Sequence, residues 1–251
     1  MSQATLEVRE EVRRRVDRGI RGFEDWYRRV KGDLYLEAEE TEILAALDLD
    51  PTHTLIDAGC GGGRFTLLAA PRCRWVRAVD LSSVAVETTV ERSRSLGLRN
   101  VSPHVADLVD GLGGIEPADR VLCVQAIQHI PTASDRLQAV KSLLDSLRPD
   151  GRLVVSVFNG GRFMDQIRGK PREFVDQKAD WLYYYRFLAG ELSGLLKLAG
   201  LREVRVRSLL NLPGRVYQWP TTRALLPLDR LLGRSPIGRG LGIYLLATGR
   251  R

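Results

Sequence analysis

The amino-acid sequence predicts an α/β fold in which a largely parallel β-sheet is flanked by helices. Short apolar segments with the length of β-strands alternate with helical segments between residues 54 and 158. The first of these strands ends at Asp57 and runs directly into a loop rich in glycine. Strands that alternate with helices form right-handed βαβ units, and such units place neighbouring strands parallel.

The elements expected before residue 158 follow from the spacing of apolar positions. Two helices open the chain, at residues 5–31 and 39–47. Strands are expected at residues 54–57, 75–80, 101–106, 120–124 and 152–158. Helices between them are expected at residues 65–70, 83–96 and 134–147. Pro149 and Gly151 lie in a turn, residues 147–151, that ends the last of these helices and leads into a strand.

The pattern loosens after residue 158. Residues 159–189 and 211–240 are irregular and contain several glycines, prolines and aromatic residues. A helix is expected between them at residues 190–199, followed by a strand at residues 203–209. The chain ends in an apolar segment, residues 242–248, that reads as a final strand.

The composition is that of a soluble globular protein, with 44% hydrophobic and 27% charged residues. No apolar run approaches the roughly 20 residues that span a bilayer, and the Glu- and Arg-rich start is unlike a signal peptide. The three cysteines have neither metal-ligand nor disulfide-framework spacing. We therefore expect a cytoplasmic protein that uses no metal.

Positive charge is concentrated at the end of the chain. From Arg202 onward the sequence has ten arginines but only two acids, Glu203 and Asp229. Such an asymmetry indicates either an anionic partner, nucleic acid or a membrane surface, or an ordinary solvated surface rich in arginine. The leucines and arginines at residues 225–234 could likewise contact a membrane peripherally or form a flap over an active site.

The glycine-rich loop is the strongest functional signal. Gly59, Gly61 and Gly63 lie at every second position around Cys60, and glycine lets the backbone approach a ligand closely. The following helix points its first N–H groups at the same place, so the loop predicts a pocket for a nucleoside-like ligand. We interpret Cys60 as a small residue that fills space, not as a nucleophile.

Acidic side chains close the first three expected strands. Asp57 ends the first, Asp80 ends the second and Asp107 follows the third. Ligands of open parallel sheets bind at the carboxyl ends of the strands, where a carboxylate can accept hydrogen bonds from ribose hydroxyls. Each acid alone could instead cap a helix or stabilise a turn.

Taken together, these residues resemble the class I S-adenosylmethionine-dependent methyltransferases. The resemblance includes the loop 57–63, Asp80, Asp107, the segment 118–130 and the turn 147–151 before a strand; Asp150 replaces a glycine usual in that turn. It runs from about residue 54 to 157. A nicotinamide-dependent dehydrogenase is the lesser alternative.

The resemblance implies a Rossmann-like, seven-stranded sheet whose last strand is antiparallel, in a single domain. It assigns residues 1–50 to a helical cap, 51–158 to the cofactor-binding core, and 190–210 with 241–251 to the end of the sheet. Residues 159–189 and 211–240 become insertions on the substrate side. Trp26, Tyr27 and Tyr35 of the cap either cover the cofactor or pack in the core.

The resemblance also implies S-adenosyl-L-methionine as cofactor, lying across Asp57 and the loop Gly59, Cys60, Gly61 and Gly63. Its ribose is expected on Asp80, with Leu81 packing on the ribose or adenine. The adenine is expected near Asp107 and Leu108, and Gln125 is expected at the methionine end.

The acceptor is expected to be a small molecule, such as a sugar, a lipid-linked compound or a secondary metabolite, and O-methylation is favoured. His129 could act as the base or only shape the pocket. Tyr184 and Arg186 could bind a planar or anionic acceptor, or only pack. An RNA methyltransferase that uses the basic C-terminal third, and a non-catalytic cofactor-binding protein, are the alternatives. The oligomeric state is left open.

Overall fold

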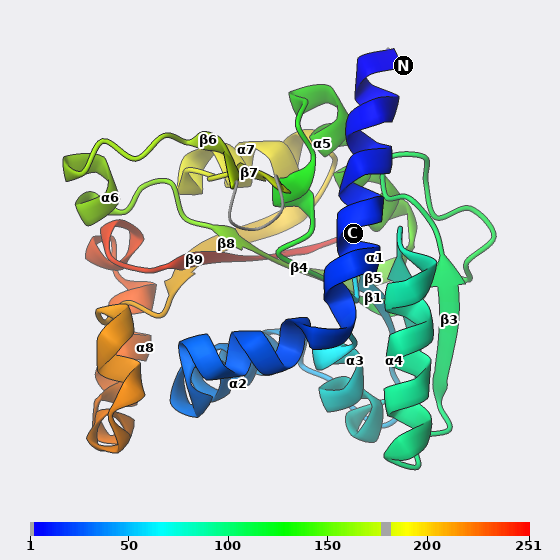
Figure 1. Ribbon diagram of the computed structural model, residues 1–251, viewed down its shortest axis with the longest axis horizontal. Coiled ribbons are helices and arrows are strands. Elements are labelled where there is room, and N and C mark those ends of the chain that lie inside the picture. The colour runs from blue at the N-terminus through cyan, green and yellow to red at the C-terminus, as the bar shows by residue number, and fades with distance from the viewer. Residues whose placement is uncertain (1–2, 177–181) are drawn as a thin grey trace.

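A computed structural model describes residues 3–176 and 182–251 of the chain. Seven strands form one sheet in the order β3-β2-β1-β4-β5-β9-β8 (Figure 1). The strands are β1 (Thr54–Ala58), β2 (Trp75–Asp80), β3 (Val101–Val105), β4 (Ala118–Val124), β5 (Leu147–Phe158), β8 (Arg202–Leu209) and β9 (Tyr244–Arg250).

The five strands from β3 to β5 pair in parallel, whereas β9 pairs antiparallel with both β5 and β8. The seven-stranded, mostly parallel sheet with an antiparallel last strand is therefore confirmed. Because β2 and β4 lie on opposite sides of β1, the strand order reverses at β1. This reversal is the position at which open sheets of this kind bind ligands.

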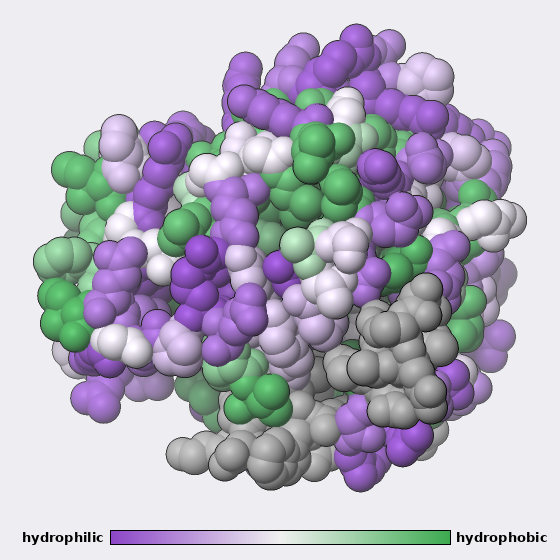
Figure 2. All heavy atoms as spheres, turned by 90° about the horizontal axis from the view of Figure 1, so that it is seen from above, coloured by the Kyte–Doolittle hydropathy of each residue, from purple (hydrophilic) through white to green (hydrophobic). Residues whose placement is uncertain are grey.

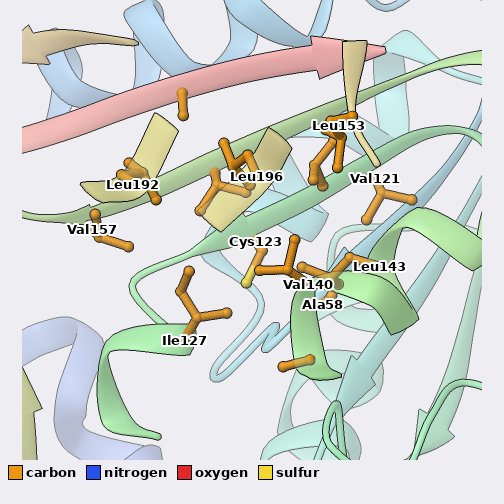
Figure 3. Close-up of a cluster of buried hydrophobic side chains, with 14 of the residues drawn as sticks. Ala58, Val121, Cys123, Ile127, Val140, Leu143, Leu153, Val157, Leu192 and Leu196 are labelled. Carbon is orange, nitrogen blue, oxygen red and sulfur yellow. The ribbon is translucent and has the colours of Figure 1, made fainter. Parts of the chain in front are cut away.

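Helices cover both faces of the sheet, as expected (Figure 1). Alternate strand residues point to opposite faces: on β4, Val121 and Cys123 belong to one core cluster and Leu122 to the other. The first cluster includes residues of α5 (Ala133–Asp145) and α7 (Ala189–Leu198) (Figure 3). The second includes residues of α2 (Asp33–Leu47) and α3 (Arg64–Ala69).

Side-chain caps fix where two of the helices begin. The Ser82 hydroxyl accepts a hydrogen bond from the Ala85 N–H at the start of α4 (Ser83–Ser95). The Thr132 hydroxyl accepts one from the Asp135 N–H at the start of α5. Each cap satisfies a helical N–H that has no partner within its own helix.

Two boundaries differ from the sequence-based prediction by five residues or more. Helix α2 begins at Asp33, not at residue 39, because its first turns are buried against the rest of the chain at Leu34, Tyr35 and Leu36. Strand β5 already begins at Leu147, so the expected turn at residues 147–151 belongs to the strand. Asp150 adopts a φ of 61° within it.

The two segments described as irregular contain regular elements. Within 159–189 there are a short helix, α6 (Phe163–Ile167), and an antiparallel hairpin of β6 (Glu173–Asp176) and β7 (Leu182–Tyr185); residues 177–181 lie outside the described part. Within 211–240, helix α8 (Leu226–Arg234) carries Pro227 in its first turn, where the missing N–H leaves no hydrogen bond unmade.

The long N-terminal helix α1 (Gln3–Lys31) runs past the sheet beside α4 and leads into α2 (Figure 1). Seen from above, the molecule exposes hydrophilic side chains with apolar ones between them (Figure 2). None of the described helices combines the length and apolar composition needed to span a membrane.

Candidate active site

The glycine-rich loop is attached to the end of β2. The N–H groups of Gly59 and Cys60 both donate to the Val79 carbonyl, at 2.8 and 2.9 Å. Gly59, Gly61 and Gly63 all adopt positive φ, at 78°, 53° and 85°. A Cβ at Gly59 would lie 2.5 Å from the Cβ of Ala126. Glycine is therefore required here by both conformation and packing.

Gly61 and Gly63 differ in what faces them. A Cβ at Gly63 would lie 2.8 Å from Cγ2 of Thr89, so this glycine allows the loop to pack on α4. At Gly61 the nearest atom is Cδ1 of Ile20 on α1, at 3.6 Å. The side of Gly61 is thus open apart from the N-terminal helix.

Asp80 lies directly against this loop. Its Oδ2 accepts a 2.9 Å hydrogen bond from the Gly61 N–H, and its Oδ1 accepts a 3.0 Å bond from the Ser82 N–H. Ser82 in turn donates its hydroxyl to the carboxylate of Asp17 on α1. Burial raises the pKa of Asp80, and the nearby Asp17 carboxylate raises it further. Two carboxylates thus lie near the end of β2, where a cation would relieve their repulsion. Leu81 follows Asp80 and is half-buried.

Asp57 and Cys60 are enclosed beneath the loop. Asp57 is only 2% exposed, and its Oδ2 accepts a 2.6 Å hydrogen bond from the Thr66 hydroxyl of α3. Burial raises the pKa of Asp57 to about 6. Burial likewise raises the pKa of the Cys60 thiol well above its ordinary value, which disfavours the nucleophilic thiolate. Asp57 thus connects the start of the loop to α3, and Cys60 is a buried residue of the loop itself.

Asp107 lies at the strand end next to Asp80. The Ala106 N–H donates to the Asp80 carbonyl at 3.0 Å, so the ends of β2 and β3 lie side by side. The Asp107 Oδ1 accepts from the Val109 N–H at 2.8 Å, as in an Asx turn. Leu108 packs against the larger hydrophobic cluster.

Gln125 contacts Glu39, and Glu39 contacts Arg64; the sequence analysis missed both of these site residues. Gln125 has a φ of 55° directly after β4, and its Nε2 donates a 2.8 Å hydrogen bond to Oε1 of Glu39 on α2. The other oxygen, Oε2, accepts from Arg64 at 2.8 Å, and Glu39 is fully buried. Glu39 is one of four glutamates in α2, so the sequence alone does not single it out.

The tyrosines of the N-terminal helices pack at the same edge of the sheet. The hydroxyls of Tyr27 and Tyr35 lie 2.8 and 3.0 Å from the Tyr244 hydroxyl at the start of β9. Tyr35 also packs edge-on against Tyr217, with 5.6 Å between ring centroids. Trp26, by contrast, is 52% exposed. Tyr27 and Tyr35 are therefore core residues that hold the N-terminal helices against β9.

His129 contacts the β6–β7 hairpin. Its Nδ1 lies 2.8 Å from the Tyr183 carbonyl oxygen, and because a carbonyl only accepts, Nδ1 carries the proton. Burial lowers the pKa of His129 to about 4, so the ring is neutral at pH 7. Tyr184 packs edge-on against His129 at 4.7 Å and stacks on Phe174 at 5.1 Å. Tyr184 therefore lies within the hairpin.

Arg186 lies at a cavity beyond the end of β5. Its guanidinium is 4.5 Å from the centroid of the Phe174 ring. The cavity has a volume of about 290 Å³. Its lining residues come from α1, the end of β5 and the residue after it, α6 and its flanks, the residue after β7, and the chain between β8 and β9: Lys31, Phe158, Asn159, Arg162, Asp165, Lys170, Arg186, Gly214 and Ile243.

The C-terminal arginines are partly neutralised. Of the ten from residue 202 onward, five form ion pairs with acids of the chain: Arg202, Arg207, Arg223, Arg230 and Arg250. Glu42 on α2 pairs with both Arg207 and Arg230, at 2.6 and 2.7 Å. Much of the excess positive charge thus attaches the C-terminal segments to α2.

Comparison with known proteins identifies the core. Residues 55–151 match the family model of a methyltransferase domain. A protein-L-isoaspartate O-methyltransferase of Azorhizobium caulinodans is 31% identical over 128 residues, covering 51% of this chain and 50% of that protein. The chain thus matches only half the length of that relative.

Solved structures share the fold across nearly the whole chain. The N-methyltransferase NodS of Bradyrhizobium japonicum, solved with S-adenosyl-L-homocysteine, superimposes with a TM-score of 0.65 at 15% identity, covering 96% of this chain and 98% of NodS. A Burkholderia thailandensis 1,6-didemethyltoxoflavin-N1-methyltransferase gives 0.67 at 20% identity, covering 100% and 92%. Residues 55–151 therefore match a methyltransferase domain, and the chain as a whole shares the fold of solved S-adenosylmethionine-dependent methyltransferases.

Proposed function

We propose that this protein transfers a methyl group from S-adenosylmethionine to a small-molecule acceptor at the carboxyl edge of its sheet. The observation that carries the proposal is the 2.9 Å hydrogen bond between the Gly61 N–H and the Asp80 carboxylate. It joins a backbone that allows close approach to an acid that can hold ribose hydroxyls, at the reversal of strand order.

We assign the cofactor to the residues expected from the sequence. The open side of Gly61 and the carboxylate of Asp80 suit the ribose, with Leu81 beside it. Asp107 and Leu108, at the neighbouring strand end, suit the adenine. We assign the rest of the loop, Gly59, Cys60 and Gly63, with the buried Asp57, to the same cofactor site, and Gln125 to its methionine end.

The electrostatics of this edge support a cationic ligand. S-adenosylmethionine supplies a methyl group that its sulfonium already activates, so the protein mainly has to bind and align the two reactants. The carboxylates of Asp80 and Asp17 lie near the glycine-rich loop. Negative charge at this edge favours a cation over a neutral ligand.

We propose that the acceptor binds beside Phe158, between the N-terminal helices (residues 1–50) and the insertions 159–189 and 211–240. Tyr184 and Arg186 belong to this side, since Tyr184 packs 5.7 Å from Phe158 and Arg186 lines the cavity. We propose oxygen as the acceptor atom. His129 packs on Tyr184, and its low pKa of about 4 makes it a weak base, so we propose that it shapes the pocket rather than removing the acceptor's proton.

An RNA acceptor is the second candidate, and the charge distribution disfavours it. RNA binding depends on cations that are free to contact phosphates. Five of the ten C-terminal arginines instead pair with acids of the same chain. We therefore favour a small molecule.

The test is a transfer assay with methyl-labelled S-adenosylmethionine and two acceptor pools, a small-metabolite extract and total tRNA. We expect label in the metabolite fraction with the natural chain and none with Asp80→Ala. Label in tRNA alone would select the RNA alternative. Transfer to neither pool by protein that binds the cofactor would contradict the proposed activity.

A further inference from the structure

The cavity beyond β5, here called the basic cavity, has an unusual charge balance for a half-enclosed site. Its lining includes four cationic side chains, Lys31, Arg162, Lys170 and Arg186, and one carboxylate, Asp165. Asp165 neutralises part of this charge, with Arg162 at 3.1 Å and Lys170 at 2.8 Å. Those two cations share a single acid.

The surroundings of Lys31 and Arg186 differ from those of Arg162 and Lys170. Among the side chains that the structure describes, neither has a carboxylate within 4.0 Å. The Lys31 Nζ lies 5.1 Å from the centroid of the Tyr35 ring, and the Arg186 guanidinium faces the Phe174 ring. Burial lowers the pKa of both groups. Two cations are thus partly desolvated at this cavity with carboxylates (Glu39 for Lys31, Asp165 for Arg186) only beyond ion-pair distance, a cost that a directly bound anion would offset.

The basic cavity adjoins the proposed methyl-transfer edge. Phe158, the last residue of β5, lines it and packs 5.3 Å from the ring of Tyr244. Tyr244 is hydrogen-bonded to Tyr27 and Tyr35, beside Lys31. Lys31 also lies within electrostatic reach of Glu39, the partner of Gln125. Packed side chains thus connect the basic cavity to the Gln125 end of the proposed site.

We propose that the basic cavity binds an anionic group of the methyl acceptor, a carboxylate or a phosphate, through Lys31 and Arg186. This inference rests on the proposed function, because it names the class of acceptor for the same site. Arg186 offers a planar pair of donors that suits either anion, and Lys31 adds a point charge. The rings of Phe158 and Tyr184 provide apolar surface for the body of the acceptor.

The experiment is calorimetric titration of the full chain with three probes of similar size, phenyl phosphate, benzoate and neutral benzyl alcohol. Lys31→Gln and Arg186→Gln are the test variants. Arg168→Gln is the matched control, because Arg168 is exposed in the same insertion and does not line the cavity. We expect at least one anionic probe to bind the natural chain, and each test variant to weaken it by about tenfold or more. The control should stay within about twofold.

Three results would overturn the proposal: no binding of either anion to the natural chain, equal binding of benzyl alcohol, or an equal loss in Arg168→Gln. A preference between phenyl phosphate and benzoate would support it and narrow the anion. Titration of the same samples with S-adenosylhomocysteine keeps the two proposals apart. Probe binding without S-adenosylhomocysteine binding would reject the methyltransferase function and leave the anion site standing.

Discussion

Gln125 donates a 2.8 Å hydrogen bond from its Nε2 to Oε1 of Glu39, and so joins the loop after β4 to helix α2. The second oxygen of Glu39 accepts from Arg64, the first residue of α3. One fully buried carboxylate therefore holds three elements together around the proposed cofactor site. The stability of this edge depends on that carboxylate.

Replacing Glu39 should be costly. Glu39→Gln removes the charge that compensates Arg64, whose side chain is only 14% exposed and whose other acid, Glu40, lies at 3.7 Å. We expect the free energy of unfolding, measured in urea, to fall by roughly 3 kcal/mol. Glu40→Gln, at the 3.7 Å pair, should cost less than Glu39→Gln, because Glu39 still compensates Arg64. Equal losses in the two variants would show that the Glu39 carboxylate does not have this role.

Asp80 should contribute strongly to cofactor affinity. Asp80→Ala removes the acceptor proposed for the ribose hydroxyls, and we expect S-adenosylmethionine binding to weaken by roughly 1.5–3 kcal/mol. The exposed Glu87 on α4 provides a control of the same charge change, and Glu87→Ala should bind normally. Unchanged affinity in Asp80→Ala, measured by calorimetry, would remove Asp80 from the ribose site.

A side chain at Gly61 should leave the fold intact but prevent the cofactor from binding. Gly61→Val fills the open side of the loop, so cofactor binding should be abolished while the sheet stays folded. Gly97→Val is the matched control, because Gly97 also has positive φ, 72°, and no atom lies within 4 Å of its added Cβ. Both variants should lose similar stability, of about 1–2 kcal/mol, from backbone strain. Near-normal cofactor affinity in Gly61→Val would mean that the ligand lies elsewhere.

Asp57 should make stability depend on pH. Its pKa is raised from 3.8 to about 6 in the folded chain, so the folded state holds this proton more tightly than the unfolded state. Asp57 therefore destabilises the fold progressively as pH rises from about 4 to about 6, by on the order of 3 kcal/mol, and by a constant amount above that. Asp57→Asn removes this penalty.

The unfolding free energy of Asp57→Asn, taken relative to that of the natural chain, should thus increase as the pH rises from about 4 to about 6. Urea denaturation at pH 4, 5, 6 and 7 measures it. Asp145→Asn, at an exposed helix end, should show no such trend. A constant difference for Asp57→Asn would contradict a raised pKa.

The core strands and the loop were predictable because their signals are local. A short apolar run that ends in Asp57 and continues into alternating glycines defines β1 and its loop without any distant contact. The ends of β1 and β2 carry acids that parallel pairing brings to one edge of the sheet. The antiparallel last strand came from the family resemblance instead.

The acceptor side could not be predicted in this way. Glu39 becomes important only through Gln125 and Arg64, which lie far from it in sequence. The hairpin at Tyr183 and Tyr184 was missed because residues 159–189 were expected to be irregular. The charge balance of the basic cavity depends on three separate segments meeting at Phe158. Tertiary contacts of this kind leave no periodic pattern in the sequence.

The most direct test of the central claim is calorimetric titration of the purified protein with S-adenosylmethionine and S-adenosylhomocysteine. The Asp80–Gly61 arrangement predicts that both bind, with dissociation constants on the order of micromolar. Failure of well-folded protein to bind either compound would contradict the claim that the glycine-rich loop holds this cofactor.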